Sequence, residues 1–183
     1  PQWFISMEKK DLRNIALKSI DETIFYPPQG QTRLRSMIET RPDWCVSRQR
    51  VWGVPLPLFI NKKTGQPLRD QKIIDRIADI YEKEGSNTWF TEDPQRFLGE
   101  EYSSSDFEQV KDVVEVWFDS GSTHAFCLEQ RQDLKWPASM YLEGSDQHRG
   151  WFHSSLLESS GTRGKAPYES VLTHGFVVDG KGR

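Results

Sequence analysis

The sequence has few cysteines, no long apolar run and little net charge, and each of these excludes a class of protein. Cys45 and Cys127 lie far apart in no paired motif, which favours free thiols in a reducing cytosol over a disulfide. No apolar run is long enough to span a bilayer, and no secretory signal opens the chain. A formal net charge of −3 excludes electrostatic binding of nucleic acid by the whole surface, although it allows a local basic surface.

Several chemical signatures are also missing. Neither G-x-G-x-x-G nor G-x-x-x-x-G-K-[ST] occurs, so neither ordinary nucleotide-binding signature applies. The histidines have no metal-ligand spacing and H-E-x-x-H is absent, so no protein-bound zinc or other metal site is expected. Ser122 lies in no G-x-S-x-G elbow, so Ser122 and His124 are not expected to form a nucleophile triad. The histidines are His124, His148, His153 and His174.

The most informative stretch spans residues 140–152. An apolar run stops at Glu143-Gly144, polar residues follow, and an aromatic, helix-compatible segment begins, which predicts a strand, a tight turn and a helix. Residues 170–178 predict a second buried strand, so the three elements predict a βαβ unit in a parallel sheet. Ligands bind at the carboxyl ends of such strands, but Ser145 or Asp146 could equally be a simple helix cap. His148 and His174 could both face a ligand, and His153 is interpreted as a surface residue.

The remaining elements follow from periodicity and turn residues. The sequence predicts strands at 3–7 and 24–26, helices at 8–20, 32–40 and 70–83, a hairpin at 58–68, and a polar peripheral excursion at 86–110. Arginines and aromatics alternate over residues 44–57, which fits either arginine stems lying over tryptophan faces or a basic rim that meets phosphate. Residues 113–122 are interpreted as a chain that re-enters a core and turns beside a cleft. Trp117 there is either simple core or the wall of a substrate pocket.

Several of these segments resemble isoleucyl-tRNA synthetases, a class I aminoacyl-tRNA synthetase family. Residues 141–152 resemble that family's adenylate-binding segment, and residues 172–176 and 179–183 resemble the lead-in to its Lys-Met-Ser-Lys-Ser loop. Residues 41–50 and 116–122 match as well. The resemblance covers essentially the whole chain and is weakest between residues 68 and 111.

The resemblance implies an α/β fold, namely the C-terminal half of a Rossmann-type parallel-sheet catalytic domain with a small α+β connective insertion. Residues 1–57 would return from an editing insertion, residues 58–112 would form the connective insertion, and residues 113–183 would bind the adenylate. The implied ligase activates isoleucine with ATP and Mg²⁺ and transfers it to tRNA(Ile). It would be cytoplasmic, without membrane contact, and monomeric as a full enzyme.

The resemblance also implies roles for individual residues. Asp146 would hold the ribose hydroxyls and Gln147 the α-amino end of the amino acid. Trp117 and Trp151 would wall the isoleucine side-chain pocket. The residues expected to bind the aminoacyl-adenylate or ATP are Glu143, Gly144, Asp146, Gln147, His174 and Gly175.

Two departures from the family limit what this chain is expected to do. The His-Ile-Gly-His signature is absent, and the Lys-Met-Ser-Lys-Ser loop would begin just after Arg183. We therefore expect the chain to be an internal fragment that is inactive in adenylation on its own. The alternatives are a fragment of a valyl-tRNA synthetase and a non-catalytic, synthetase-like binding module.

Overall fold

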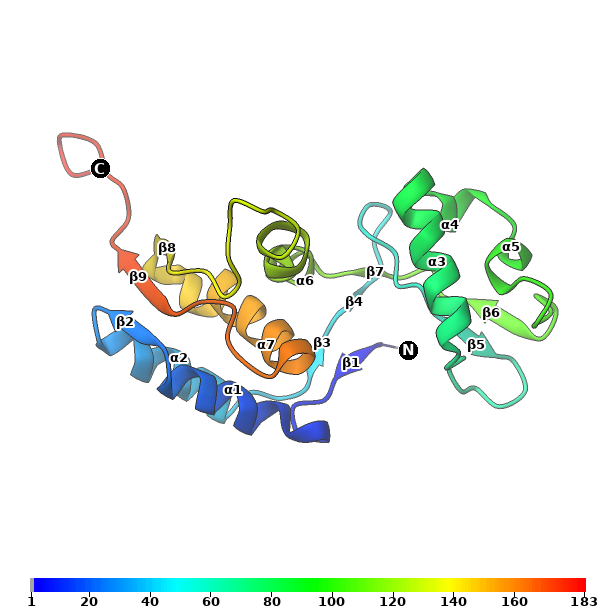
Figure 1. Ribbon diagram of the computed structural model, residues 1–183, viewed down its shortest axis with the longest axis horizontal. Coiled ribbons are helices and arrows are strands. Elements are labelled where there is room, and N and C mark those ends of the chain that lie inside the picture. Colours follow the sequence, from blue (N-terminus) through cyan, green and yellow to red (C-terminus); the bar gives the residue numbers. More distant parts are fainter. Residues whose placement is uncertain (1) are drawn as a thin grey trace. The chain divides into compact units, whose positions relative to one another are not determined.

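The computed structural model describes residues 2–183, which form two compact units (Figure 1). The first unit contains residues 3–46 and 116–183, and the second contains residue 2 and residues 47–115. The elements of the first unit are β1 (Phe4–Ile5), η1 (Lys9–Asp11), α1 (Leu12–Asp21), β2 (Ile24–Tyr26), α2 (Gln29–Glu39), β3 (Trp44–Cys45), α6 (Val116–Gly121), η2 (His124–Leu128), β8 (Tyr141–Gly144), η3 (Ser145–Arg149), α7 (Trp151–Arg163) and β9 (Ser170–His174).

A three-stranded parallel sheet organises the first unit, with strand order β2-β9-β8. Phe25, Val171 and Tyr141 pair across the three strands, and all three are buried on one face. The next row, Tyr26, Leu172 and Leu142, points to the opposite face because strand side chains alternate. The chain order β8, α7, β9 with parallel pairing confirms the predicted βαβ unit and the α/β fold class.

Helix α7 lies at the centre of the first unit, and residues 152–160 are all buried. Leu156 and Leu157 share one core cluster with Leu34 and Ile38 of α2 and with Ile20 of α1. Helix α1 runs alongside α7 (blue and orange in Figure 1), and α2 packs against α1. This arrangement buries the apolar stripes of α1 and α2 against the sheet-bound helix.

Several predicted boundaries in this unit were wrong, including the start of α2, which begins at Gln29 rather than near residue 32. Helix α1 begins at Leu12 rather than near residue 8, because Lys10 and Asp11 adopt φ angles of 54° and 61° that interrupt a regular helix. Strand β9 ends at His174, so the predicted strand to residue 178 is too long. The neighbouring strand β8 ends at Gly144, which pairs with His174, so β9 has no partner in β8 beyond that residue. Val177, which follows, is 90% exposed.

The second unit has its own apolar cluster. Its elements are β4 (Ser47–Arg48), β5 (Phe59–Asn61), α3 (Gln71–Glu84), α4 (Thr88–Thr91), α5 (Pro94–Leu98), β6 (Phe107–Gln109) and β7 (Val113–Val114). Asp70 caps α3 by accepting from the Lys72 amide at 2.9 Å, as the sequence predicts. The predicted hairpin is present as a bridge between Ile60 and Pro67.

The segment 86–110 was predicted to be peripheral, but it contains α4, α5 and β6 and contributes to the core of the second unit. Trp89 and Phe97 are fully buried. The ring centroid of Trp89 lies 4.9 Å from that of Phe97 and 5.0 Å from that of Phe59. Strand β6 also pairs antiparallel with β5. Residues 113–122 form β7 and then the helix α6, where the sequence analysis expected a turn.

Candidate functional site

The carboxyl ends of β8 and β9 bring the first group of predicted residues together. Gly144 and His174 are register partners, so Glu143, the turn after Gly144, and His174 share one sheet edge. A Cβ on Gly144 would lie 2.6 Å from Oδ1 of Asp146 and 4.0 Å from Cε1 of His174. A side chain at position 144 would therefore force the Asp146 carboxylate to move. Nothing lies within 4 Å of a Cβ on Gly175, so a larger side chain would fit there without a clash.

The turn after β8 is held by Gln147. Its Oε1 accepts from the Trp151 amide at 2.9 Å, and its Nε2 donates to Oδ2 of Asp146 at 3.2 Å. The N-cap positions of η3 and α7 are Gly144 and Gly150, so the simple capping role suggested for Ser145 or Asp146 is wrong. The side chain of Gln147 instead satisfies the first amide of α7.

Gly150 permits this arrangement. A Cβ there would lie 2.4 Å from Oε1 of Gln147 and 3.0 Å from Cη2 of Trp117. The side chains of Gln147 and Trp117 therefore both lie close to Gly150 at the start of α7. The sequence alone indicates no such role for Gly150.

Trp151 is fixed on two sides. Its ring stacks on Tyr141 with centroids 3.9 Å apart and planes inclined by 7°. Its Nε1 donates to the Ser120 carbonyl of α6 at 2.9 Å. Trp117, on the same helix α6, is 42% exposed, so it is not simple core. Tyr141 and Ser120 were missed by the sequence analysis, because their contacts join segments far apart in the chain.

The histidines divide into buried and exposed groups. His148 is 2% exposed, its Nδ1 lies 2.7 Å from the Ser145 carbonyl, and its ring packs edge-on against Phe152. Burial lowers the pKa of His148, with a further lowering from Arg33. It faces the core rather than a ligand site, whereas His174 is exposed at the sheet edge.

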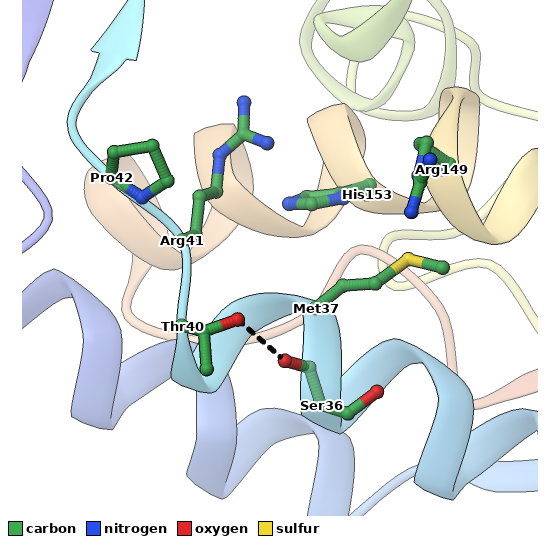
Figure 2. Close-up of a pocket in the computed structure, with 7 residues that line it drawn as sticks. All are labelled: Ser36, Met37, Thr40, Arg41, Pro42, Arg149 and His153. Atoms are coloured by element: carbon green, nitrogen blue, oxygen red, sulfur yellow. Dashed lines mark hydrogen bonds between the residues drawn. The ribbon is translucent and has the colours of Figure 1, made fainter.

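The interpretation of His153 as a surface residue was wrong. His153 is 5% exposed and lines a cleft between α2 and α7 (Figure 2). Burial, followed by the charges of Arg41 and Arg149, lowers the pKa of His153 to about 3. Its position on a helix buried on all sides explains the error, because no amphipathic pattern marks that helix.

One aromatic residue of the arginine-rich segment, Trp44, is covered by an arginine that lies just before that segment. Arg41 lies over Trp44, with Cζ 5.7 Å from the ring centroid, which fits an arginine stem covering an aromatic face. Trp52, in contrast, is 87% exposed, and Arg48 lies 3.9 Å from Glu115.

Residues 2–183 contain neither a cluster of metal ligands nor a membrane-spanning helix. No cluster of three histidine, cysteine or carboxylate side chains is placed to hold a metal ion in this part of the chain. Every helix among these same residues is too short or too polar to cross a bilayer.

The fold and the sheet-edge site define a class of protein. The family described as "tRNA synthetases class I (I, L, M and V)" matches residues 1–183, and the chain belongs to this family.

Its relatives narrow this class further. The chain is 70% identical over 182 residues to an isoleucine–tRNA ligase of Pelagibacter ubique (strain HTCC1062). It is 59% identical to the enzyme of that name from Brucella suis biovar 1 (strain 1330) and 54% identical to that from Gluconobacter oxydans (strain 621H). All of the chain is covered in each case, but it spans only about a fifth of each relative's length.

Proposed function

We propose that the full-length protein containing this chain is an isoleucine–tRNA ligase. The observation that carries the proposal is the 70% identity, along the entire chain, to a relative of that name. The ligase would activate isoleucine with ATP and transfer it to tRNA(Ile). The residues at the carboxyl ends of β8 and β9 would bind the isoleucyl-adenylate.

Asp146 and Gln147 have the chemistry for the polar part of this ligand. An ionised aspartate only accepts hydrogen bonds, so Asp146 suits two ribose hydroxyls. Oε1 of Gln147 already accepts from the Trp151 amide. A carbonyl oxygen has a second lone pair, which can accept from the α-ammonium group of isoleucine. Glu143 and Gly144 would border the ligand.

The tryptophans suit the apolar part of the ligand. Tyr141 and Ser120 hold Trp151 on two sides, and Trp117 lies against Gly150 next to it. Such walls discriminate poorly between isoleucine and valine, since one methylene changes binding by about 1–3 kcal/mol. His174 and Gly175 would lie on the adenine side, supported by the pairing of His174 with Gly144.

The proposed reaction needs positioning rather than a protein nucleophile. A carboxylate oxygen of isoleucine attacks the α-phosphorus of ATP, and the bond to the pyrophosphate oxygen breaks. Asp146 and Gln147 would hold the two reactants in line, which is how binding contributes to such a displacement. Mg²⁺ would accompany the ATP, whose phosphate oxygens are its usual ligands, and would neutralise their charge. Residues 2–183 contain no cluster that would hold the ion by themselves.

The wider organisation is also a proposal. Residues 1–57 would be the return from an editing insertion, residues 58–112 the connective insertion, and residues 113–183 the adenylate-binding half. Both faces of a parallel sheet are normally covered. Here Tyr26 and Leu142 are 49% and 53% exposed on one face, which supports further parts of the full-length protein packing there. That protein would be a cytoplasmic monomer.

An exchange assay tests the function. The full-length protein would be given ATP, labelled pyrophosphate and either isoleucine or valine. Strong exchange with isoleucine and weaker exchange with valine is expected, whereas the isolated chain of residues 1–183 should give none. Preferential exchange with valine would change the substrate, and no exchange with either amino acid would indicate a binding module.

A further inference from the structure

Tyr141 is held in the sheet by its backbone and by its ring. It begins β8, pairs with Val171 of β9 and is 3% exposed on the buried face of the sheet. Its ring packs at tilted angles against Tyr168 and Phe152, whose centroids lie 4.9 Å and 6.4 Å away. The Tyr168 hydroxyl donates to the Phe152 carbonyl at 3.1 Å, which ties these two neighbours together. Tyr141 is therefore a fixed platform at the start of the strand that leads into the proposed adenylate site.

The ring of Tyr141 covers one face of Trp151. The two centroids lie 3.9 Å apart and the planes are inclined by only 7°. Aromatic pairs more often have centroids about 4.5–7 Å apart, in offset or edge-to-face arrangements, so these two rings overlap closely. Trp151 is only partly buried, so it keeps accessible surface that Tyr141 does not cover.

A hydrogen bond fixes the indole of Trp151 within the plane of this stack. Its Nε1 donates to the Ser120 carbonyl at 2.9 Å, and the same oxygen accepts from Oγ1 of Thr123 at 2.6 Å. A carbonyl oxygen has two lone pairs, so both hydrogen bonds form together. The stack prevents the indole from moving toward β8, and the hydrogen bond prevents it from rotating in its own plane. Trp151 is thereby held in one position.

We propose that Tyr141 is a positioning residue that determines how well the enzyme distinguishes isoleucine from valine. This inference rests on the proposed ligase function, in which Trp151 walls the amino-acid side-chain pocket. Isoleucine has one more methylene group than valine, and a hydrophobic pocket uses such a group for roughly 10- to 200-fold discrimination. This contact depends on close approach, because a gap of about 0.5–1 Å already loses roughly a quarter to a half of the van der Waals attraction. A Trp151 that is free to shift would therefore discriminate less.

Replacing Tyr141 with leucine tests this role, because leucine keeps an apolar side chain but removes the ring that supports Trp151. The full-length protein would be assayed for pyrophosphate exchange with isoleucine and with valine. The ratio of the two kcat/KM values should fall about two- to tenfold, which is roughly a quarter to a half of the methylene discrimination on a logarithmic scale. KM for isoleucine should rise with little change in kcat, because the lost contact lies away from the reacting carboxylate.

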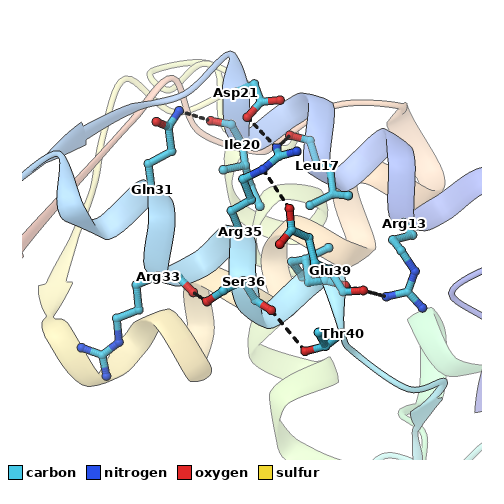
Figure 3. Close-up of polar contacts among 11 residues, drawn as sticks. Arg13, Leu17, Ile20, Asp21, Gln31, Arg33, Arg35, Ser36, Glu39 and Thr40 are labelled. Carbon is cyan, nitrogen blue, oxygen red and sulfur yellow. Dashed lines mark hydrogen bonds and ion pairs between the residues drawn. The ribbon is translucent and has the colours of Figure 1, made fainter.

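Three further variants separate positioning from a general loss of packing. Tyr141→Phe keeps the stacked ring and should keep the ratio of the unchanged protein. Phe25→Leu removes a ring from the same buried row of the sheet, two strands away, and should lower stability without changing the ratio. Arg35→Gln removes the ion pairs of Arg35 with Asp21 at 2.7 Å and Glu39 at 3.1 Å (Figure 3), and should also leave the ratio unchanged. Thermal unfolding of each variant would show how much stability it has lost.

The outcomes distinguish the positioning role from the proposed function. If the unchanged protein gives no isoleucine-dependent exchange, the ligase function is refuted and the positioning role with it. Normal exchange with an unaltered ratio in Tyr141→Leu, or an equal fall in Tyr141→Phe or Phe25→Leu, would refute the positioning role alone. Should Tyr141→Leu fail to fold, Tyr141→Met provides the same test, because its flexible side chain fills more of the vacated space. A fall confined to the variants without the ring would support the proposal.

Discussion

Replacing Gly150 with alanine should disturb the proposed adenylate site through Gln147. The new Cβ would lie 2.4 Å from Oε1 of Gln147, closer than real carbon and oxygen atoms approach. The Gln147 side chain can rotate away, but it then loses the 2.9 Å hydrogen bond that its Oε1 accepts from the Trp151 backbone amide. The Cβ would also press on Cη2 of Trp117 at 3.0 Å.

The size of the effect follows from these contacts. Losing one hydrogen bond at a helix N-terminus costs about 1 kcal/mol. Displacing Gln147 and Trp117 by a few tenths of an ångström adds a similar amount, so we expect a loss of about 1–2 kcal/mol in unfolding free energy. If the displaced Gln147 and Trp117 hold the transition state less well by the same amount, isoleucine-dependent pyrophosphate exchange should fall roughly 5- to 30-fold, since about 1.4 kcal/mol corresponds to a factor of ten. Denaturant unfolding and exchange would be measured on the full-length protein.

Gly161→Ala is the matched control on the same helix. A Cβ at Gly161 meets only Cδ1 of Leu12 at 3.5 Å, an ordinary contact. Alanine is the better helix former by up to about 1 kcal/mol, so this variant should be equally or more stable and fully active. If Gly150→Ala behaved like Gly161→Ala in both measurements, the argument that Gly150 makes room for Gln147 would be refuted.

Three further predictions concern the packing of α7. Gly121→Ala should lower the unfolding free energy by about 1–3 kcal/mol in denaturant titrations, because its Cβ would lie 2.2 Å from Oε1 of Glu158 and 3.0 Å from the Ser154 backbone. Leu156→Ala should cost about 2–5 kcal/mol in the same assay, since Leu156 is fully buried. The pKa of His153 is about 3, below its unfolded value, so the unfolded chain takes up the proton first as the pH falls. Stability should therefore drop below pH 6.5 by up to about 1.4 kcal/mol per pH unit, and His153→Phe should lessen the slope between pH 7 and pH 5.

Local signals predicted the parts of the fold that depend on neighbouring residues. Asp70 and Gly85 mark the two ends of α3, because a capping side chain and a flexible closing residue act within one turn. The strand, turn and helix from Tyr141 onward were likewise predicted from a change in residue type. That prediction also places the residues at the ends of β8 and β9 together, because the carboxyl ends of parallel strands lie at the same edge of the sheet.

Long-range contacts account for most of what the sequence did not show. Residues 59–61 pair with residues 107–109 although the helices α3, α4 and α5 lie between them in the chain, and no turn motif predicts that register. Trp89 and Phe97 lie in a polar segment, so their burial against Phe59 depends on that pairing rather than on their neighbours. The one feature of the sequence that indicated their burial was their size, because large aromatic residues bury much apolar surface on folding.

Helix α7 turns neighbouring side chains toward different parts of the first unit. Trp151 and His153 are two residues apart, and each residue advances an α-helix by about 100°. Their side chains therefore leave the helix about 200° apart, Trp151 toward Ser120 of α6 and His153 toward the cleft beside α2. Leu156 is fully buried and fixes this rotation, since turning the helix would remove it from its core partners. A substitution at His153 should thus leave the contact between Trp151 and Ser120 in place, whereas a change that rotates the helix must disturb both residues.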